Sequence, residues 1–168
     1  MADEFDSAQI DEESELDEAL DEMYLTFMLG DEEYGINIAY VTEIIGIQAI
    51  TYVPDLPVFV KGIINLRGQI IPVIDVRLRF QKEEIEYNDR TCVIVLQIKD
   101  LSIGFIVDSV AACGAIPNEN VIEPPTAQHN ITNRKYISGI GKLSEKIVLI
   151  LDCGKLIGED MGISLEVA

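Results

Sequence analysis

The chain has 168 residues, 48% of them hydrophobic, and it carries 30 acidic against 12 basic residues. This hydrophobic content suits one compact domain, or two very small domains that share a core, and it excludes a chain that is mainly disordered. The acidic excess is local, because residues 1–60 contain 16 acidic residues and no Lys or Arg. The rest is near neutral and offers no basic surface for nucleic acid, so we expect no nucleic-acid partner.

Residues 1–22 form an acidic segment with 11 acidic residues and no basic residue. We expect this segment to be disordered, because like charges repel and few apolar side chains could anchor it. It has no apolar stretch of the kind found at the centre of a signal peptide. No apolar run in the chain reaches the length of a membrane span. We therefore expect a cytoplasmic protein without direct membrane insertion.

From residue 24 onward, short apolar runs alternate with turn residues about every ten positions, which is typical of a β-sandwich or β-barrel. Four hairpins are predicted, and their paired strands are 24–29 with 34–39, 63–66 with 70–74, 91–98 with 101–107, and 136–143 with 146–151. Short helical turns are expected over 76–80 and 153–157, because Asp75 and Asp152 can cap them. Helix is thus the minor component.

A faint internal repeat links the two halves of the chain. Residues 34–41 align with 103–110 at a shift of 69, and residues 70–75 align with 147–152 at a shift of 77. The repeat predicts two small, similar β-barrels packed against each other. Neither half alone would bury much core, so the face that the barrels share should be apolar.

Residues suited to catalysis or metal binding are sparse. His129 is the only histidine and lies in a polar segment, so neither a histidine-dependent triad nor a multi-histidine metal site is expected. Residues 136–143 differ from a phosphate-binding loop at two required positions, since Tyr136 replaces the first glycine and Leu143 replaces the serine or threonine. The three cysteines, an odd number without C-x-x-C spacing, indicate reduced thiols. We predict no catalytic residue, no metal and no cofactor.

Two features point instead to contacts with other proteins. Residues 24–29 and 34–38 do not alternate cleanly between apolar and polar, and the apolar residues Val41, Ile44, Ile45 and Ile47 follow closely. Strands that are apolar on both faces must be covered, so at least one apolar docking patch is expected. Arg67 is one of only two basic residues among the first 76, and it lies in a tight turn where Gly68 can adopt a positive φ. Its guanidinium suits bidentate contact with carboxylates or carbonyls. The alternatives are an ordinary solvated arginine or a structural pair with Glu43.

Several segments together form a specific pattern: Leu-Gly-Asp-Glu-Glu-Tyr-Gly-Ile at 29–36, Val-Thr-Glu-Ile at 41–44, and Lys-Gly-Ile-Ile-Asn-Leu-Arg-Gly at 61–68, followed by 93–96, 104–110 and 136–139. Over about residues 22–158 the chain resembles the CheW-like family of bacterial chemotaxis coupling proteins. The resemblance implies an all-β fold with minor short helices, in which two five-stranded SH3-like barrels pack around a shared hydrophobic core. It also implies a CheW-like domain over 23–158 and a C-terminal tail over 159–168.

The resemblance further implies an adaptor that is not an enzyme. Proteins of this family couple the cytoplasmic tips of chemoreceptors to the regulatory domain of the histidine kinase CheA, within membrane-associated receptor arrays. The implied kinase-binding residues lie on the apolar face of the first barrel and are Leu25, Ile38 and Val41. The implied receptor-binding residues lie along the groove between the barrels and are Glu43, Gly62, Asn65, Arg67 and Gly68. The alternative function is a barrel that binds a small ligand, or an enzyme whose site the sequence does not reveal.

Overall fold

The computed structural model of the protein describes residues 21–124 and 135–157. The disorder expected for the acidic segment therefore falls almost wholly outside the described residues. The same is true of the C-terminal tail and of His129.

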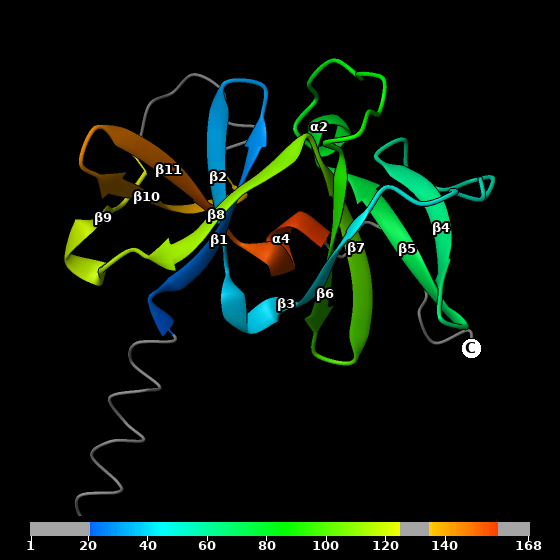
Figure 1. Ribbon diagram of the computed structural model, residues 1–168, viewed down its shortest axis with the longest axis horizontal. Helices are drawn as coiled ribbons and strands as arrows, with labels where there is room; N and C mark the ends of the chain where they lie inside the picture. Colours follow the sequence, from blue (N-terminus) through cyan, green and yellow to red (C-terminus); the bar gives the residue numbers. More distant parts are fainter. Residues whose placement is uncertain (1–20, 125–134, 158–168) are drawn as a thin grey trace, which may run out of the picture.

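Two curved β-sheets lie side by side (Figure 1). The six-stranded sheet has the order β8 (Ser109–Ala115), β1 (Met23–Leu29), β2 (Glu32–Asn37), β11 (Lys146–Leu151), β10 (Ile137–Leu143) and β9 (Val121–Ile122). The five-stranded sheet has the order β3 (Val41–Gly46), β6 (Cys92–Ile98), β7 (Leu101–Val107), β5 (Gln69–Asp75) and β4 (Val60–Leu66). The predicted all-β fold is confirmed, and the two-residue strand β9 adds a sixth strand to the first barrel.

Within residues 22–124 and 135–157, the helical elements are short, and they join or cover the strands. They are η1 (Ile38–Tyr40), α2 (Val76–Arg79), η2 (Asn118–Asn120) and α4 (Cys153–Ile157). Both predicted caps are present, since the side chain of Asp75 accepts the Arg77 N–H at 3.0 Å and that of Asp152 accepts the Lys155 N–H at 3.0 Å. The two helical turns predicted after these aspartates are therefore confirmed.

All four predicted hairpins are present, and each has a two-residue loop. The second strand of the first hairpin was predicted over 34–39 but is β2 over Glu32–Asn37, and residues 38 and 39 belong to η1. The first loop residue has a positive φ in every case: 61° at Gly30, 52° at Arg67, 56° at Lys99 and 46° at Ser144. Hairpins with two-residue loops favour such backbone angles because they match the twist of the paired strands.

Each barrel is built from both halves of the chain. The β1–β2 hairpin joins the β10–β11 hairpin through a parallel pairing of β2 with β11, and the β6–β7 hairpin joins the β4–β5 hairpin through β5 and β7. Val73 lies opposite Gly104, and Ile150 lies opposite Gly35. These two pairs are related by the shifts of 69 and 77 found in the sequence, so the structure supports the internal repeat. The halves therefore exchange hairpins and do not fold as separate barrels.

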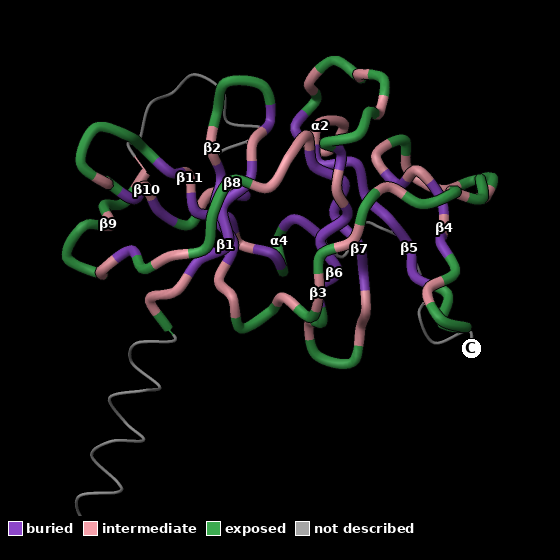
Figure 2. Tube along the Cα trace, in the orientation of Figure 1, coloured by how far each residue is buried: buried purple, intermediate pink, exposed green. Residues whose placement is uncertain are grey.

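The largest group of buried side chains lies between the two sheets. It joins residues of β1, β2, β5, β6 and β7 to α2 and α4, and α4 lies between the barrels at the centre of the view (Figures 1 and 2). Each sheet also has a smaller core, formed around Ile64, Val73 and Val93 in one sheet and around Tyr24, Ile116 and Val148 in the other. The predicted shared apolar face is thus confirmed.

A polar contact also ties the barrels together beside the shared core. Arg77 of α2 donates from Nε to Oδ1 of Asp108 at 2.7 Å, and it forms a second bond from Nη2 to Oδ2. The same carboxylate accepts the N–H of Gly30, in the β1–β2 turn, at 2.7 Å. Burial alone would raise the pKa of Asp108, but the bonds from Arg77 and Gly30 outweigh burial and hold this pKa below its usual value.

Candidate functional site

Arg67 lies at the tip of the β4–β5 hairpin, in a turn that its neighbours stabilise. Arg67 and Gly68 have φ angles of 52° and 85°. The side chain of Asn65 accepts the Gly68 N–H at 2.9 Å, which closes the turn from the strand side. The positive φ predicted for Gly68 is thus confirmed, and the bond from Asn65 is a turn contact that the sequence analysis did not foresee. The turn holds the Arg67 side chain outward.

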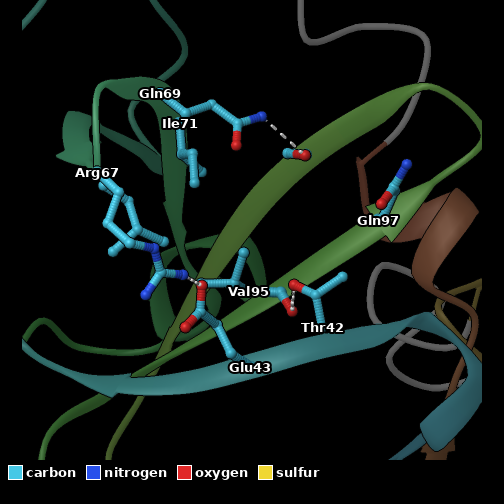
Figure 3. Close-up of a pocket in the computed structure, with 9 residues that line it drawn as sticks. Thr42, Glu43, Arg67, Gln69, Ile71, Val95 and Gln97 are labelled. Atoms are coloured by element: carbon cyan, nitrogen blue, oxygen red, sulfur yellow. Dashed lines mark hydrogen bonds and ion pairs between the residues drawn. The ribbon is translucent and has the colours of Figure 1, made fainter.

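Arg67 forms an ion pair with Glu43 of β3 across the rim of a surface hollow (Figure 3). The Arg67 side chain is 72% exposed and that of Glu43 is 30% exposed. The pair is therefore a surface contact that water and salt screen, and not a buried structural bridge. Within the described part of the chain, Glu43 is the hydrogen-bonding partner found for Arg67, and a guanidinium has further N–H groups that can face a partner.

The hollow beside this pair has a volume of about 360 Å³. Its walls come from β3, from the β4–β5 hairpin and from the β6–β7 hairpin. Gln69 donates from Nε2 to Oγ of Ser102 at 3.2 Å, and the Thr42 hydroxyl donates to the Val95 carbonyl at 3.0 Å (Figure 3). All of its lining residues belong to the five-stranded barrel. The hollow therefore differs from the groove between the barrels along which the receptor contacts are expected, and that expectation stays a prediction.

Gly62 has a structural role that the sequence did not reveal. Its φ is 150°, and a Cβ at this position would lie 2.1 Å from the carbonyl oxygen of Thr51. Thr51 and Ile63 exchange two backbone hydrogen bonds here, at 2.8 and 2.9 Å, which brings the loop before β4 against the strand. Any side chain at residue 62 would force the loop away from β4, so Gly62 acts on the neighbouring turn only through the backbone.

The three residues expected to bind the kinase do not lie on one face of one barrel. Leu25 is 4% exposed and lies in the shared core, on the six-stranded sheet. Val41 is half-buried on β3 of the other sheet, and Ile38 is half-buried in η1, the link between the two sheets. Leu25 points into the core because strand β1 is covered on both faces, so the face assigned to it was wrong.

Two exposed apolar side chains accompany Ile38 and Val41. Tyr40 is 42% exposed and Ile44 is 44% exposed. Burial alternates along β3, with residues 42, 44 and 46 exposed, so Ile44 occupies a position where a polar residue is usual. The sequence had already included Ile44 among the apolar residues behind the expected docking patch, and its exposure on the edge strand β3 agrees with that prediction.

The described residues were also searched for other chemistry. Among residues 21–124 and 135–157, no group of three or more His, Cys, Asp or Glu side chains is placed to hold a metal ion. The three cysteines are free, and burial raises the pKa of the Cys153 thiol to about 12. No described helix is long and apolar enough to cross a membrane.

Two small barrels around one core, with a charged turn and apolar side chains exposed on an edge strand, define a protein-binding module. A family model described as the CheW-like domain matches residues 23–161, and the chain belongs to that family. Chemotaxis protein CheW of Klebsiella aerogenes is 36% identical over 152 residues, which cover 90% of this chain and 91% of that protein. Chemotaxis protein CheW of Treponema pallidum is 36% identical over 136 residues, which cover 79% of each chain.

A solved structure agrees with these relatives. The crystal structure of the scaffolding protein TtCheW from Thermoanaerobacter tengcongensis has a TM-score of 0.75 and 33% identity, covering 83% of this chain and 97% of that one. The family resemblance and the two SH3-like barrels are thus confirmed. The protein is a chemotaxis scaffold or adaptor of a non-enzymatic family.

Proposed function

We propose that this protein couples the cytoplasmic tips of chemoreceptors to the regulatory domain of the histidine kinase CheA, so that receptors control kinase activity. The protein would act in the cytoplasm, at the receptor array, through protein contacts alone. The observation that carries the proposal is the Arg67–Glu43 pair, held at a rigid turn beside an open hollow in a protein of a chemotaxis scaffold family.

The receptor side of the proposal rests on the exposure and charge of this turn. Arg67 is 72% exposed, and the nearest polar side chains around the hollow are uncharged, apart from Glu43. A partner that offers a carboxylate or a backbone carbonyl can therefore pair with the guanidinium, while its own cation can approach Glu43. Asn65 and Gly68 fix the turn, and Gly62 fixes the strand that carries it.

The kinase side rests on the apolar residues around η1 and β3. Ile38 and Val41 are half-buried there, while Tyr40 and Ile44 are more than 40% exposed. An apolar contact of this kind would be stabilised by removal of these side chains from water, and would change little with salt. Leu25 lies in the shared core, against which Val41 also packs, and would support this surface only indirectly.

Reconstitution with the kinase and receptor-containing membranes tests the proposal. The full chain should sediment with the membranes and raise kinase activity. Arg67→Glu should lower receptor-stimulated activity by at least about tenfold, since losing a paired charge at an interface costs about 2–5 kcal/mol. Its binding to the isolated kinase should stay unchanged. Arg90→Glu is the matched control, because Arg90 is also an exposed arginine but lies away from the hollow. It precedes the first residue of β6, whereas Gln97, which lines the hollow, is near the last residue of that strand.

Two outcomes would contradict the proposal at different points. If the unaltered chain neither binds the kinase nor raises its activity with receptors, the coupling function itself is wrong. If the chain couples normally and a folded Arg67→Glu variant couples equally well, the function stands but the receptor site lies elsewhere.

A further inference from the structure

A second hollow lies on the six-stranded barrel, between the tips of the β1–β2 and β10–β11 hairpins. Its volume is about 410 Å³. Met28, Ile147 and Leu149 supply its apolar lining, and acidic side chains that include Asp31 and Glu145 lie around them. None of these residues belongs to the surfaces proposed above for the receptor or the kinase.

The internal repeat relates this hollow to the one beside Arg67. A shift of 77 places Lys146 on Gln69, and a shift of 69 places Glu33 on Ser102; all four residues line their hollows. Gln69 donates to Ser102 at 3.2 Å, and Lys146 donates to Glu33 at 3.1 Å. The same two positions are thus joined by a side-chain hydrogen bond in each barrel, so the hollows have a common construction.

Each barrel also exposes an isoleucine at the same place. Ile70 follows Gln69 on β5 and is 56% exposed, and Ile147 follows Lys146 on β11 and is 59% exposed. A single exposed isoleucine is ordinary, but apolar side chains that adjoin one another and are rimmed by polar groups mark a contact surface. In the second hollow Ile147 itself forms part of the lining, together with the half-buried Met28 and Leu149.

The two hollows differ in charge. The repeat places Ser144 where the first hollow has Arg67 and Ala112 where it has Glu43, so the ion pair has no counterpart. Four acidic residues line the second hollow instead: Asp31, Glu32, Glu33 and Glu145. Lys146 and Lys82 pair with Glu33 and Glu32, which leaves Asp31 and Glu145 as its excess negative charge.

We propose that the second hollow is a docking site for a cationic segment of a partner protein, in which an aliphatic side chain is flanked by Lys or Arg. The aliphatic side chain would pack on Ile147, Met28 and Leu149, and the flanking cations would approach Asp31 and Glu145. Opposite charges would steer and orient the segment. Because the whole protein is acidic and attracts any cation, the apolar contact would be what directs the segment to this hollow. This site goes beyond the proposed coupling function and does not depend on it.

Binding of synthetic peptides to the full chain tests the site. The probe is a peptide of leucines flanked by lysines, and its control carries serines in place of the leucines. At about 150 mM salt, where long-range attraction is screened, the leucine peptide should shift the backbone amide NMR signals of residues 28–33 and 145–149 in a saturable manner. Ile147→Ser should weaken binding about fivefold, because part of one aliphatic contact is lost.

Two matched variants make the result specific. Ile70→Ser removes the equivalent isoleucine from the other barrel and should leave peptide binding unchanged. Glu145→Lys reverses a charge at the hollow without touching its apolar lining, and it should weaken binding as well. Because Ile147 and Glu145 are both exposed, each variant should fold, and Glu145→Lys provides the test if Ile147→Ser does not.

The inference is overturned if the serine peptide binds as well as the leucine peptide, or if Ile70→Ser and Ile147→Ser weaken binding equally. Either result would mean that the acidic chain attracts any cationic peptide. Absence of saturable binding to residues 28–33 and 145–149 would overturn it too. None of these outcomes bears on Arg67, so the coupling function would be judged separately.

Discussion

Residues around the Arg67 turn have two different roles: some expose charge to a partner, and others allow the backbone conformation of the turn. Arg67 and Glu43 expose charge, and their pair on the surface contributes about 0–1 kcal/mol to the stability of the fold. Gly62 and Gly68 instead allow backbone angles that other residues adopt at a cost, with φ of 150° and 85°. The charges offered to a partner thus come from Arg67 and Glu43, which contribute little to stability. The backbone that positions them depends on the two glycines.

Gly62→Ala is expected to destabilise the protein strongly. The added Cβ would meet the Thr51 carbonyl oxygen at 2.1 Å, so the two hydrogen bonds between Thr51 and Ile63 could not persist as they are. We expect the free energy of unfolding to fall by about 3 kcal/mol, from overpacking and backbone strain together. Urea unfolding followed by circular dichroism measures the change. Gly68→Ala is the comparison, since a Cβ there meets nothing within 4 Å. A larger loss for Gly68→Ala would contradict the structural role assigned to Gly62.

At the scale of elements, η1 and β3 form the connection between the barrels and carry exposed apolar side chains. η1 follows the last strand residue of β2 in the six-stranded sheet, and β3 begins the five-stranded sheet directly after it. Asn37 caps η1 by accepting the Ala39 N–H at 2.9 Å, which fixes the turn that presents Ile38 and Tyr40. A kinase bound to this connection would therefore contact both barrels.

Ile38→Asp is expected to weaken kinase binding at least about tenfold, because a carboxylate would replace an aliphatic side chain in a contact that excludes water. Titration of the kinase regulatory domain by calorimetry measures the affinity, at two salt concentrations. The affinity of the unaltered chain should change little with salt. Ile122→Asp is the matched control, since Ile122 is 44% exposed on β9, at the opposite edge of its sheet from β8.

The assignment of η1 would fail if a folded Ile38→Asp variant bound the kinase with unchanged affinity. If that variant did not fold, Ile38 would belong to the core. Ile44→Asp would then test the surface, because Ile44 is 44% exposed on the neighbouring strand.

At the scale of the whole molecule, two contacts hold the barrels in one orientation. The shared apolar core gives most of the stabilisation. The contact of Arg77, Asp108 and Gly30 fixes the orientation of the barrels, since hydrogen bonds are directional and the three groups lie in α2, in the link from β7 to β8, and in the β1–β2 turn. The side chains of Arg77 and Asp108 are 15% and 20% exposed, so this pair is shielded from solvent much more than the Arg67–Glu43 pair. Hydrogen bonds to a shielded charge are worth about 1.5–3 kcal/mol.

The Arg77–Asp108 contact predicts a specific dependence of stability on pH. The folded-state pKa of Asp108 lies below its unfolded value, so its contribution is present above the unfolded pKa and is lost as pH falls through the folded pKa. Asp108→Asn should lower the free energy of unfolding by about 2 kcal/mol at pH 7. The difference between variant and unaltered chain should shrink steadily below about pH 4, as Asp108 of the unaltered chain takes up a proton.

Urea unfolding at a series of pH values measures this difference directly. Asp89→Asn is the control, because Asp89 is an exposed acid in the loop before β6 and its replacement should change stability little at any pH. A difference between Asp108→Asn and the unaltered chain that stays constant down to low pH would show that the carboxylate charge is not what stabilises the contact.

The sequence by itself determined the local features of this protein. The four hairpins, the caps at Asp75 and Asp152, and the turn of Asn65, Arg67 and Gly68 follow from turn residues and apolar runs that lie close together in the chain. The sequence repeat likewise predicted two similar barrels with a shared apolar face. These features depend on neighbouring residues, whose backbone preferences a sequence shows directly.

Only the tertiary structure decided which hairpins pair with each other. The parallel pairings of β2 with β11 and of β5 with β7 join residues far apart in the chain, and no local pattern specifies them. These pairings place the hollow of Arg67 within one barrel and form the second hollow beside Ile147, while packing of the two sheets against each other buries Leu25. An apolar side chain becomes core or surface according to the elements that cover its strand, and that cover is set by long-range packing.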